Sequence, residues 1–286
     1  DWSSDVCSSD LISNSDFTEV VDIKSKNELE SLGNNINKMA SKLKQNIEEL
    51  NGLNDKLKIE LKEKEKLLET EKTFMRAIGH ELKTPVAIIN GYIEALQDGI
   101  IEETEKEKIY EIIYNEAMSI DKLVKDINSY LKSEFKDLKP TFEKINMKKV
   151  IEFGLKKYSL DIEQKKVDLK LELEDLEIKT DVKIFNIILN NLLTNALTYM
   201  NDEKKLGIYL RDNSLVIENS ADTISDEVIE KIFNPFYKID SSRNRKYGGT
   251  GLGLSIVKNL LEALNLKYSF TYDKDRKFAK FTIIFL

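Results

Sequence analysis

The sequence predicts a multidomain protein: an α-helical coiled coil, then a helical hairpin that pairs into a dimeric four-helix bundle, then an α+β sandwich. Apolar residues spaced three and four apart over 29–61 predict the coiled coil, and amphipathic stripes of helical period over 71–135 predict the hairpin. After Pro140, several segments alternate with period two, which is typical of strands. The 286 residues, 41% of them hydrophobic, suffice for more than one core.

Charge and cysteine content narrow the functional classes. A net charge of -7 disfavours a nucleic-acid binder, which needs a concentrated cationic face. The single cysteine, Cys7, excludes an intramolecular disulfide framework and a multi-cysteine metal site, and it fits a reducing compartment. No apolar run reaches the roughly 18 to 20 residues of a membrane span.

The first eleven residues form an unusual string. "DWSSDVCSSDL" back-translates without a mismatch to a sequence that resembles a common sequencing-library adapter. We therefore expect residues 1–11 to be an assembly artefact, so that Cys7 and Trp2 carry no function and the true protein continues upstream of Ile12.

The predicted coiled-coil seam has one irregularity, at the consecutive four-residue steps from Met39 to Leu43 and on to Ile47. A plain spacer helix is the alternative for this stretch. Its apolar positions are Leu29, Leu32, Ile36, Met39, Leu43, Ile47, Leu50, Leu57 and Leu61.

The start of this region, "DFTEVVDIKSKNELESLGNNINKMASKL", resembles the second half of a HAMP linker, with Asn37 and Met39 matching its N-x-M. We assign 12–46 to this linker and 47–70 to a signalling helix. HAMP units follow a transmembrane helix, so the resemblance implies a missing membrane anchor and sensor, with the present portion in the cytoplasm.

The hairpin region, 71–137, has a first helix that ends near "QDGI", where Asp98 and Gly99 mark a turn, and a second helix over about 104–135. Because a hairpin alone cannot bury both apolar stripes, we expect two chains to form a four-helix bundle. The stripe residues are Phe74, Ile78, Leu82, Ile89, Ile93 and Leu96, then Ile109, Ile112, Ile113, Leu123, Ile127 and Leu131.

His80 is the only histidine. At 100° per residue it lies about 160° to 200° from Ile78 and Leu82, so it points away from the packed stripe. A neutral imidazole is nucleophilic, and the adjacent Glu81 offers a carboxylate for its other ring nitrogen. Pro85 cannot donate to the carbonyl of Glu81, so we expect the helix to bend or loosen there.

The string "FMRAIGHELKTP" resembles the H-box of sensor histidine kinases of two-component systems. The resemblance implies that His80 accepts the γ-phosphoryl group of ATP and then passes it to an aspartate of a response regulator. It also implies that Glu81 acts as general base and that Thr84 places water for a phosphatase activity. The matching residues are Phe74, His80, Glu81, Leu82, Thr84 and Pro85.

"FNIILNNLLTNALTYM" is an apolar helix with embedded asparagines, which are poor choices for a helix interior. Asn191 and Asn195 share a face, which suits phosphate oxygens and hydrated Mg²⁺. The string resembles the N-box of the same family, which implies that Asn195 ligates Mg²⁺ and that Tyr199 packs by the adenine. Thr198 stands where the family carries a cation, so one charged phosphate contact is lost.

"GGTGLGLSIVKNLLEAL" leads a glycine-rich loop into a helix, a favourable site for phosphates. It resembles the G-x-G-x-G nucleotide box of the family. The preceding string, "KIFNPFYKIDSSRNRKYGG", resembles its F-box and ATP lid, whose arginines could close over the triphosphate. A solvated basic loop is the alternative for each lid residue. The matching positions are Gly249, Gly251 and Gly253, Phe233 and Phe236, and Arg243 and Arg245.

The box that reads adenine departs from the family pattern D-x-G-x-G-I and reads "NSADTI". Asn219 replaces the aspartate, so we expect nucleotide binding to weaken by roughly 1 kcal/mol. Ala221 and Thr223 replace both glycines, which matters most if either position requires a positive φ.

These resemblances imply a Bergerat (GHKL) ATPase fold for residues 138–286, with ATP and Mg²⁺ as ligands. The sequence is thereby identified as a fragment of a homodimeric sensor histidine kinase. One alternative is an ATPase of the related chaperone, topoisomerase and mismatch-repair group, which lacks an H-box. The other is an ATP-binding pseudokinase that serves as a dimeric scaffold, motivated by Thr198 and the altered adenine box.

Overall fold

The computed structural model describes residues 28–134, 139–239 and 249–285. The predicted adapter segment, the first part of the HAMP-like linker and the lid arginines Arg243 and Arg245 lie outside these residues. The chain divides into two compact units, with the boundary between Thr73 and Phe74.

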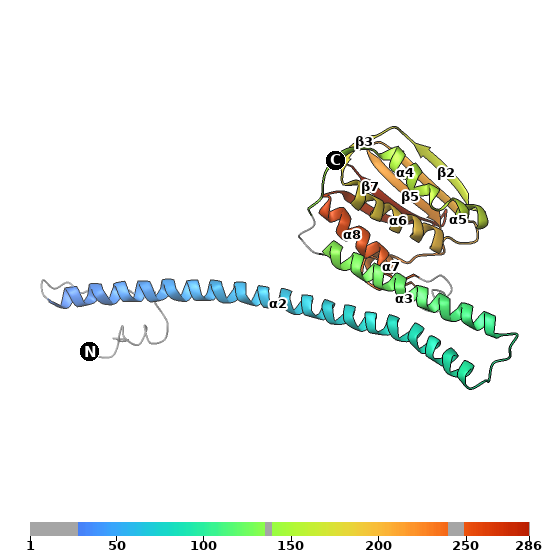
Figure 1. Cartoon of the computed structure of the whole chain (residues 1–286). Helices are drawn as coiled ribbons and strands as arrows, with labels where there is room; N and C mark the ends of the chain where they lie inside the picture. Colours follow the sequence, from blue (N-terminus) through green and yellow to red (C-terminus); the bar gives the residue numbers. More distant parts are fainter. Residues whose placement is uncertain (1–27, 135–138, 240–248, 286) are drawn as a thin grey trace. The chain divides into compact units, whose positions relative to one another are not determined.

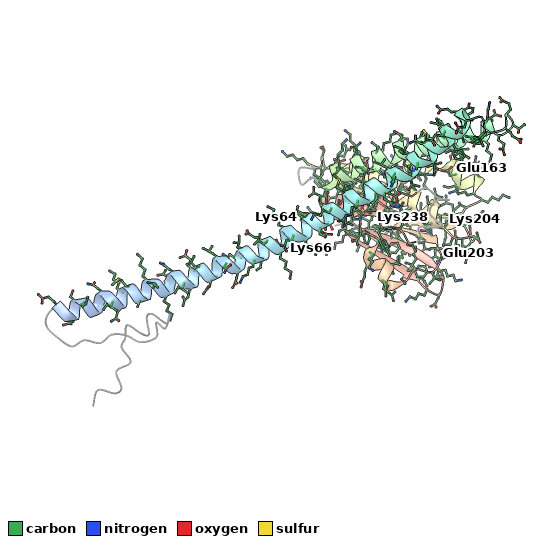
Figure 2. The ribbon with its side chains drawn as sticks, turned by 90° about the horizontal axis from the view of Figure 1, so that it is seen from below. Lys64, Lys66, Glu163, Glu203, Lys204 and Lys238 are labelled. Atoms are coloured by element: carbon green, nitrogen blue, oxygen red, sulfur yellow. The ribbon has the colours of Figure 1, made fainter. Side chains whose placement is uncertain are left out.

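The first unit consists, in its described part, of the beginning of helix α2, which spans Glu28–Gln97 (Figure 1). Charged side chains such as Lys64 and Lys66 extend outward from it (Figure 2). The predicted helix is confirmed, whereas its coiled-coil partner stays a prediction. Seam residues that are at least half exposed are Leu32, Met39, Leu43, Leu50, Leu57 and Leu61. Within the described ranges, no helix has the length and apolarity of a membrane span.

The second unit begins with the predicted hairpin. Helix α2 ends at Gln97, Gly99 adopts a φ of 69° in the turn, and helix α3 spans Lys106–Glu134. Helix α2 continues through Pro85. The hydrogen bond that the proline nitrogen cannot donate is therefore lost without ending the helix. Ile93 and Leu131 of the predicted stripe stay 39% and 38% exposed, leaving apolar surface for a further partner.

The α+β region contains a five-stranded sheet in the order β2-β4-β5-β7-β6 and a separate pair, β1-β3. Only β2 and β4 pair in parallel, so the predicted mostly antiparallel sheet is confirmed. The period-two segments became β2, β4, β5 and β7. The strands are β1 Glu143–Asn146, β2 Asp168–Leu173, β3 Glu177–Thr180, β4 Lys205–Arg211, β5 Ser214–Ser220, β6 Lys267–Asp273 and β7 Phe278–Ile284.

Helices α4, α6 and α8 cover one face of this sheet, which makes the predicted sandwich (Figure 1). Alternation explains the packing: Leu206, Ile208 and Leu210 of β4 are at most 1% exposed and form part of the core beneath these helices. The helices are α4 Met147–Lys156, α5 Ser159–Gln164, α6 Val182–Tyr199, α7 Asp226–Lys231 and α8 Gly253–Ala263.

Helix α6 begins at a well-defined cap. The Asp181 carboxylate accepts hydrogen bonds from the backbone N–H groups of Lys183 at 2.9 Å and Ile184 at 3.1 Å, and from Thr141 at 2.8 Å. Burial alone would raise the pKa of Asp181, but these backbone donors outweigh it and lower the pKa. The charged cap fixes the start of the helix that carries Asn191 and Asn195.

Candidate functional site

His80 lies exposed on α2, whereas Ile78 and Leu82 are half-buried. The predicted orientation of the imidazole away from the packed stripe is therefore confirmed. Thr84 sits one turn later, and its hydroxyl donates to the carbonyl oxygen of His80 at 3.3 Å. The ring is accessible to a second reactant, as a phosphoryl acceptor requires.

Glu81 forms a contact that sequence reasoning missed. The Nζ of Lys238 donates to Oε2 of Glu81 at 2.7 Å, and the two side chains are only 17% and 33% exposed. Lys238 follows the aromatic pair of the "NPFYK" string, which offered a cation but no indication of its partner. The carboxylate beside His80 is thus held by a residue of the α+β domain.

Further contacts join the hairpin to the α+β domain within this unit. The Thr250 hydroxyl, inside the glycine-rich loop, donates to Oδ2 of Asp126 on α3 at 2.7 Å. Phe74 stacks on Tyr130 at 4.9 Å between ring centroids and meets Phe236 at 5.3 Å. The matched H-box phenylalanine therefore packs between the hairpin and the F-box.

The glycine-rich loop lies directly against α6. A Cβ added to Gly253 would come within 3.1 Å of Oδ1 of Asn191, and one added to Gly249 would clash with the Tyr199 hydroxyl oxygen. Burial raises the pKa of Tyr199. The predicted N-box and glycine box, far apart in sequence, are thus brought into contact.

The backbone conformation at position 251 requires a glycine. Its φ is +76°, and an added Cβ would lie 2.8 Å from the carbonyl carbon of Phe236. The two residues are also joined by a hydrogen bond, because the N–H of Phe236 donates to the carbonyl oxygen of Gly251 at 3.0 Å. Phe236 itself has a φ of 62°, an uncommon conformation for a bulky residue. The loop and the F-box therefore fix each other's shape.

Asn195 and Asn219 line a common cavity of about 20 Å³ between α6 and the sheet. Such a volume is far below that of a typical ligand site. The remaining lining residues are Leu192, Ala196, Ile217, Leu254, Phe270, Ala279 and Phe281.

The altered adenine box is unstrained in this structure. Asn219 is 9% exposed, and its Nδ2 donates to the carbonyl oxygen of Ser220 at 2.9 Å. Neither Ala221 nor Thr223 is among the described residues with a positive φ. The loss of both glycines therefore carries no backbone penalty here, which removes one motive for the scaffold alternative.

Phe233 lies against strands β6 and β7. It packs edge-on against Tyr268 at 5.6 Å and Phe281 at 6.3 Å, and belongs to the residues packed on the core. Phe233 reaches the cavity only indirectly, through its contact with Phe281, which lines the cavity. The asparagines of α6 also differ in role, because Asn190 accepts from the Tyr158 hydroxyl at 3.0 Å and so faces α4 and α5.

The residues present fit a nucleotide with a bound cation. Any Cβ at Gly249 would fill the space between the glycine loop and Tyr199. Asn195 carries an amide oxygen, which is a type of ligand that Mg²⁺ accepts. Among the described residues, no group of three or more His, Cys, Asp or Glu side chains could hold a metal alone.

Two family models match this chain. Residues 70–135 match the His Kinase A (phospho-acceptor) domain, and residues 180–286 match the histidine kinase-, DNA gyrase B- and HSP90-like ATPases. The first match contains His80. The second contains α6 and the glycine-rich loop, and it supplies an ATP-binding domain.

Curated relatives extend the similarity. Sensor histidine kinase CssS of Bacillus subtilis (strain 168) is 28% identical over 266 residues, which are 92% of this chain and 53% of the relative. Signal transduction histidine-protein kinase BaeS of Escherichia coli (strain K12) is 30% identical over 255 residues, 87% of this chain and 50% of that protein. The chain thus spans about half the length of these relatives.

Solved structures share the fold. Histidine kinase AdeS of Acinetobacter baumannii gives a TM-score of 0.57 at 26% identity, covering 72% of this chain and 96% of that one. Histidine kinase ThkA in complex with response regulator protein TrrA gives 0.59 at 24% identity, covering 74% and 61%.

Proposed function

From the match of residues 70–135 to the phospho-acceptor domain of histidine kinases and of residues 180–286 to the histidine kinase-, DNA gyrase B- and HSP90-like ATPases, we propose that the chain phosphorylates His80 with ATP and passes the phosphoryl group to an aspartate of a response regulator. One observation carries the proposal. The exposed imidazole of His80 lies in the same compact unit as the asparagine face of α6 and the glycine loop, with Lys238 bridging to Glu81.

In the proposed reaction, one ring nitrogen of His80 attacks the γ-phosphorus of ATP. The bond from that phosphorus to the β–γ bridging oxygen breaks, and ADP leaves with the electron pair. The proton on the other ring nitrogen passes to Glu81, which removes the positive charge that develops on the imidazole. Phosphoryl transfer depends chiefly on positioning and electrostatics, so placing the two domains together supplies most of the catalysis.

We assign nucleotide binding to residues of the second domain. The backbone of Gly249, Gly251 and Gly253 approaches the phosphates, Asn191 contacts them from α6, and Tyr199 packs by the adenine. Asn195 holds Mg²⁺, which when bound neutralises phosphate charge. Phe233 supports the pocket from the core, and Arg243 and Arg245 close the lid. Thr198 leaves the family's cation position neutral, which costs one phosphate contact of about 1.5 to 3 kcal/mol.

The same proposal includes a dimer and a membrane anchor. The apolar surface left at Ile93 and Leu131 supports a second hairpin completing a four-helix bundle. The HAMP-like segment, 12–46, supports an upstream membrane-spanning sensor. The complex of ThkA with TrrA supports a response regulator as the phosphoryl acceptor, and Thr84 places the water that hydrolyses the phosphorylated regulator.

A transfer experiment tests this function. The chain is incubated with γ-labelled ATP and Mg²⁺, freed of nucleotide, and mixed with the receiver domain of the response regulator encoded beside its gene. We expect the label to leave the chain and appear on the receiver, and to stay on the chain when the receiver's acceptor aspartate is changed to asparagine. Label that never leaves the chain, or moves equally to the Asp→Asn receiver, would refute the proposed transfer.

A further inference from the structure

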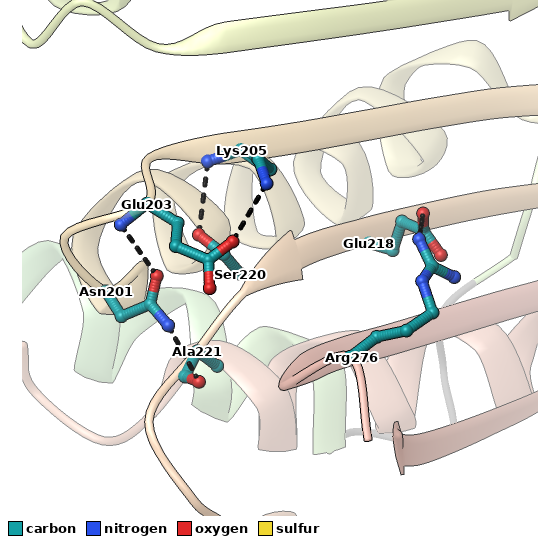
Figure 3. A network of polar contacts seen from close by, with 7 residues as sticks. All are labelled: Asn201, Glu203, Lys205, Glu218, Ser220, Ala221 and Arg276. Carbon is teal, nitrogen blue, oxygen red and sulfur yellow. Dashed lines mark hydrogen bonds and ion pairs between the residues drawn. The ribbon is translucent and has the colours of Figure 1, made fainter. Parts of the chain in front are cut away.

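The altered adenine box is tied to the connection between α6 and β4. The Nδ2 of Asn201 donates to the carbonyl oxygen of Ala221 at 3.1 Å, and the backbone N–H of Lys205 donates to Oγ of Ser220 at 3.1 Å (Figure 3). The backbone N–H of Asn201 donates to the carbonyl oxygen of Ser220, also at 3.1 Å. We call Asn201 and Ser220 the clamp.

The clamp is itself held in one geometry. Oδ1 of Asn201 accepts from the backbone N–H of Glu203 at 3.0 Å, which fixes which end of its amide faces Ala221 (Figure 3). Met200 and Ala221 form an antiparallel bridge beside it. Ser220 is 0% exposed and Ala221 4% exposed, so water cannot replace a lost partner without a rearrangement.

Asn219 shares an atom with the clamp. The carbonyl oxygen of Ser220 accepts both from Nδ2 of Asn219, at 2.9 Å, and from the backbone N–H of Asn201, at 3.1 Å. The side chains of the clamp hold the backbone around this carbonyl, because Asn201 bonds to Ala221 and Ser220 accepts from Lys205, and they thereby fix the acceptor that orients the Asn219 amide. With Nδ2 directed to that carbonyl, the end of the amide that stays available for a ligand is Oδ1, a hydrogen-bond acceptor.

This orientation has a chemical consequence because an amide, unlike a carboxylate, has two different ends. An amide with its oxygen toward a purine accepts from a 6-amino group, as in adenine. The flipped amide presents an NH₂ that suits a 6-oxo group, as in guanine. At a position where the family uses aspartate, a freely rotating asparagine would read both bases.

We propose that Asn201 and Ser220 are positioning residues that restrict Asn219 to one amide orientation and thereby set the preference for ATP over GTP. The inference rests on the proposed function, because it takes Asn219 as the base-reading residue. It goes further in assigning base selectivity to residues beside the pocket. An aspartate can only accept hydrogen bonds from the base, and the fixed orientation of Asn219 makes the asparagine present an acceptor in the same way.

The test measures equilibrium binding of the whole chain to a fluorescent ADP analogue, displaced by ATP or by GTP. We expect Asn201→Ala and Ser220→Ala each to weaken ATP binding by about three- to tenfold, the equivalent of one hydrogen bond. GTP binding should change less or tighten, so the ratio of the two affinities shrinks. Asn201→Asp keeps the acceptor for Glu203 but loses the donor to Ala221, and should behave like Asn201→Ala.

Matched controls exist in the same domain. Asn146 also accepts one backbone N–H, from Lys149, and donates to Asp175, but at the start of α4. Ser214 donates to the carbonyl oxygen of Arg211 at the opposite end of the β4–β5 hairpin. We expect Asn146→Ala and Ser214→Ala to leave the ATP-to-GTP ratio at the wild-type value, even where thermal unfolding shows equal loss of stability.

Kinetics separate positioning from catalysis. In the clamp variants the KM for ATP in His80 phosphorylation should rise while kcat at saturating ATP stays within twofold of wild type. An unchanged ATP-to-GTP ratio in Asn201→Ala, or an equal change in the Asn146→Ala control, would overturn the positioning role alone. A wild-type chain that binds no adenine nucleotide would overturn the proposed function and this inference together.

Discussion

Replacing Asn195 by alanine should lower the rate of His80 phosphorylation by a factor on the order of 10² to 10³, the usual effect of removing one group that stabilises charge in a transition state. Asn195 lies on the face of α6 that borders the cavity, beside Asn219. Its amide oxygen is the ligand that we assign to Mg²⁺. The change removes no core packing, so the unfolding temperature should stay near that of the wild type.

Asn190→Ala is the matched control for this prediction. Asn190 lies on the same helix but bonds to Tyr158, away from the cavity. Its loss should lower the free energy of unfolding by about 0.5 to 1.5 kcal/mol, because the Tyr158 hydroxyl loses one hydrogen bond but keeps its contact with Thr194. The phosphorylation rate at saturating Mg²⁺ and ATP should stay close to wild type. An Asn195→Ala rate within threefold of wild type would remove Asn195 from the proposed site.

Gly251→Ala should weaken nucleotide binding at least tenfold. The left-handed conformation at φ +76° costs a residue with a Cβ roughly 1–2 kcal/mol. The new methyl group would also lie 2.8 Å from the Phe236 carbonyl carbon, so the loop or the F-box must shift. Since that loop also holds Gly249 and Gly253, the shift moves the backbone that we assign to the phosphates.

Titration with a fluorescent ADP analogue checks the glycine prediction. Gly91→Ala serves as control, because Gly91 lies in helix α2 and an added Cβ there would meet nothing within 4 Å. We expect that variant to bind nucleotide like the wild type and to be slightly more stable, as alanine is the better helix former. Wild-type affinity in Gly251→Ala would show that the loop does not require its observed shape.

Periodicity predicted the parts of this fold that depend on local pattern. The hairpin helices and strands β2, β4, β5 and β7 carry apolar residues at the spacing of their own period, so this spacing reveals them. Strands β1 and β3 are four residues long, which is too short for a clear alternation. They form because they pair with each other, β1 directly before α4 and β3 directly before the cap of α6. This pairing depends on the tertiary structure.

Motifs predicted which residues meet, but not how they are held. The strings around Asn191 and Gly253 indicated one nucleotide site, and the structure places these residues in contact. The pairing of Lys238 with Glu81, and of Asn201 with Ala221, joins segments with no periodic relation in sequence. Such contacts depend on the packed arrangement of helices and sheet, so no spacing rule could have found them.

Residue type alone could not separate equivalent candidates. The two F-box phenylalanines look alike in sequence, yet Phe233 packs edge-on against Tyr268 while Phe236 meets Phe74 of the hairpin and the glycine loop. The backbone of the altered adenine box was equally unreadable, because Ala221 gives no sign of its φ. The φ at this position can be read only from the structure.

The central claim is that ATP bound in the second domain phosphorylates His80. The most direct measurement incubates the whole chain with γ-labelled ATP and Mg²⁺ and follows the label through acid and alkali treatment. A phosphoryl group on an imidazole nitrogen is lost in acid and kept in alkali, so we predict acid-labile, alkali-stable label on the wild type and none on His80→Gln. Acid-stable label, or equal label on the His80→Gln variant, would contradict the account.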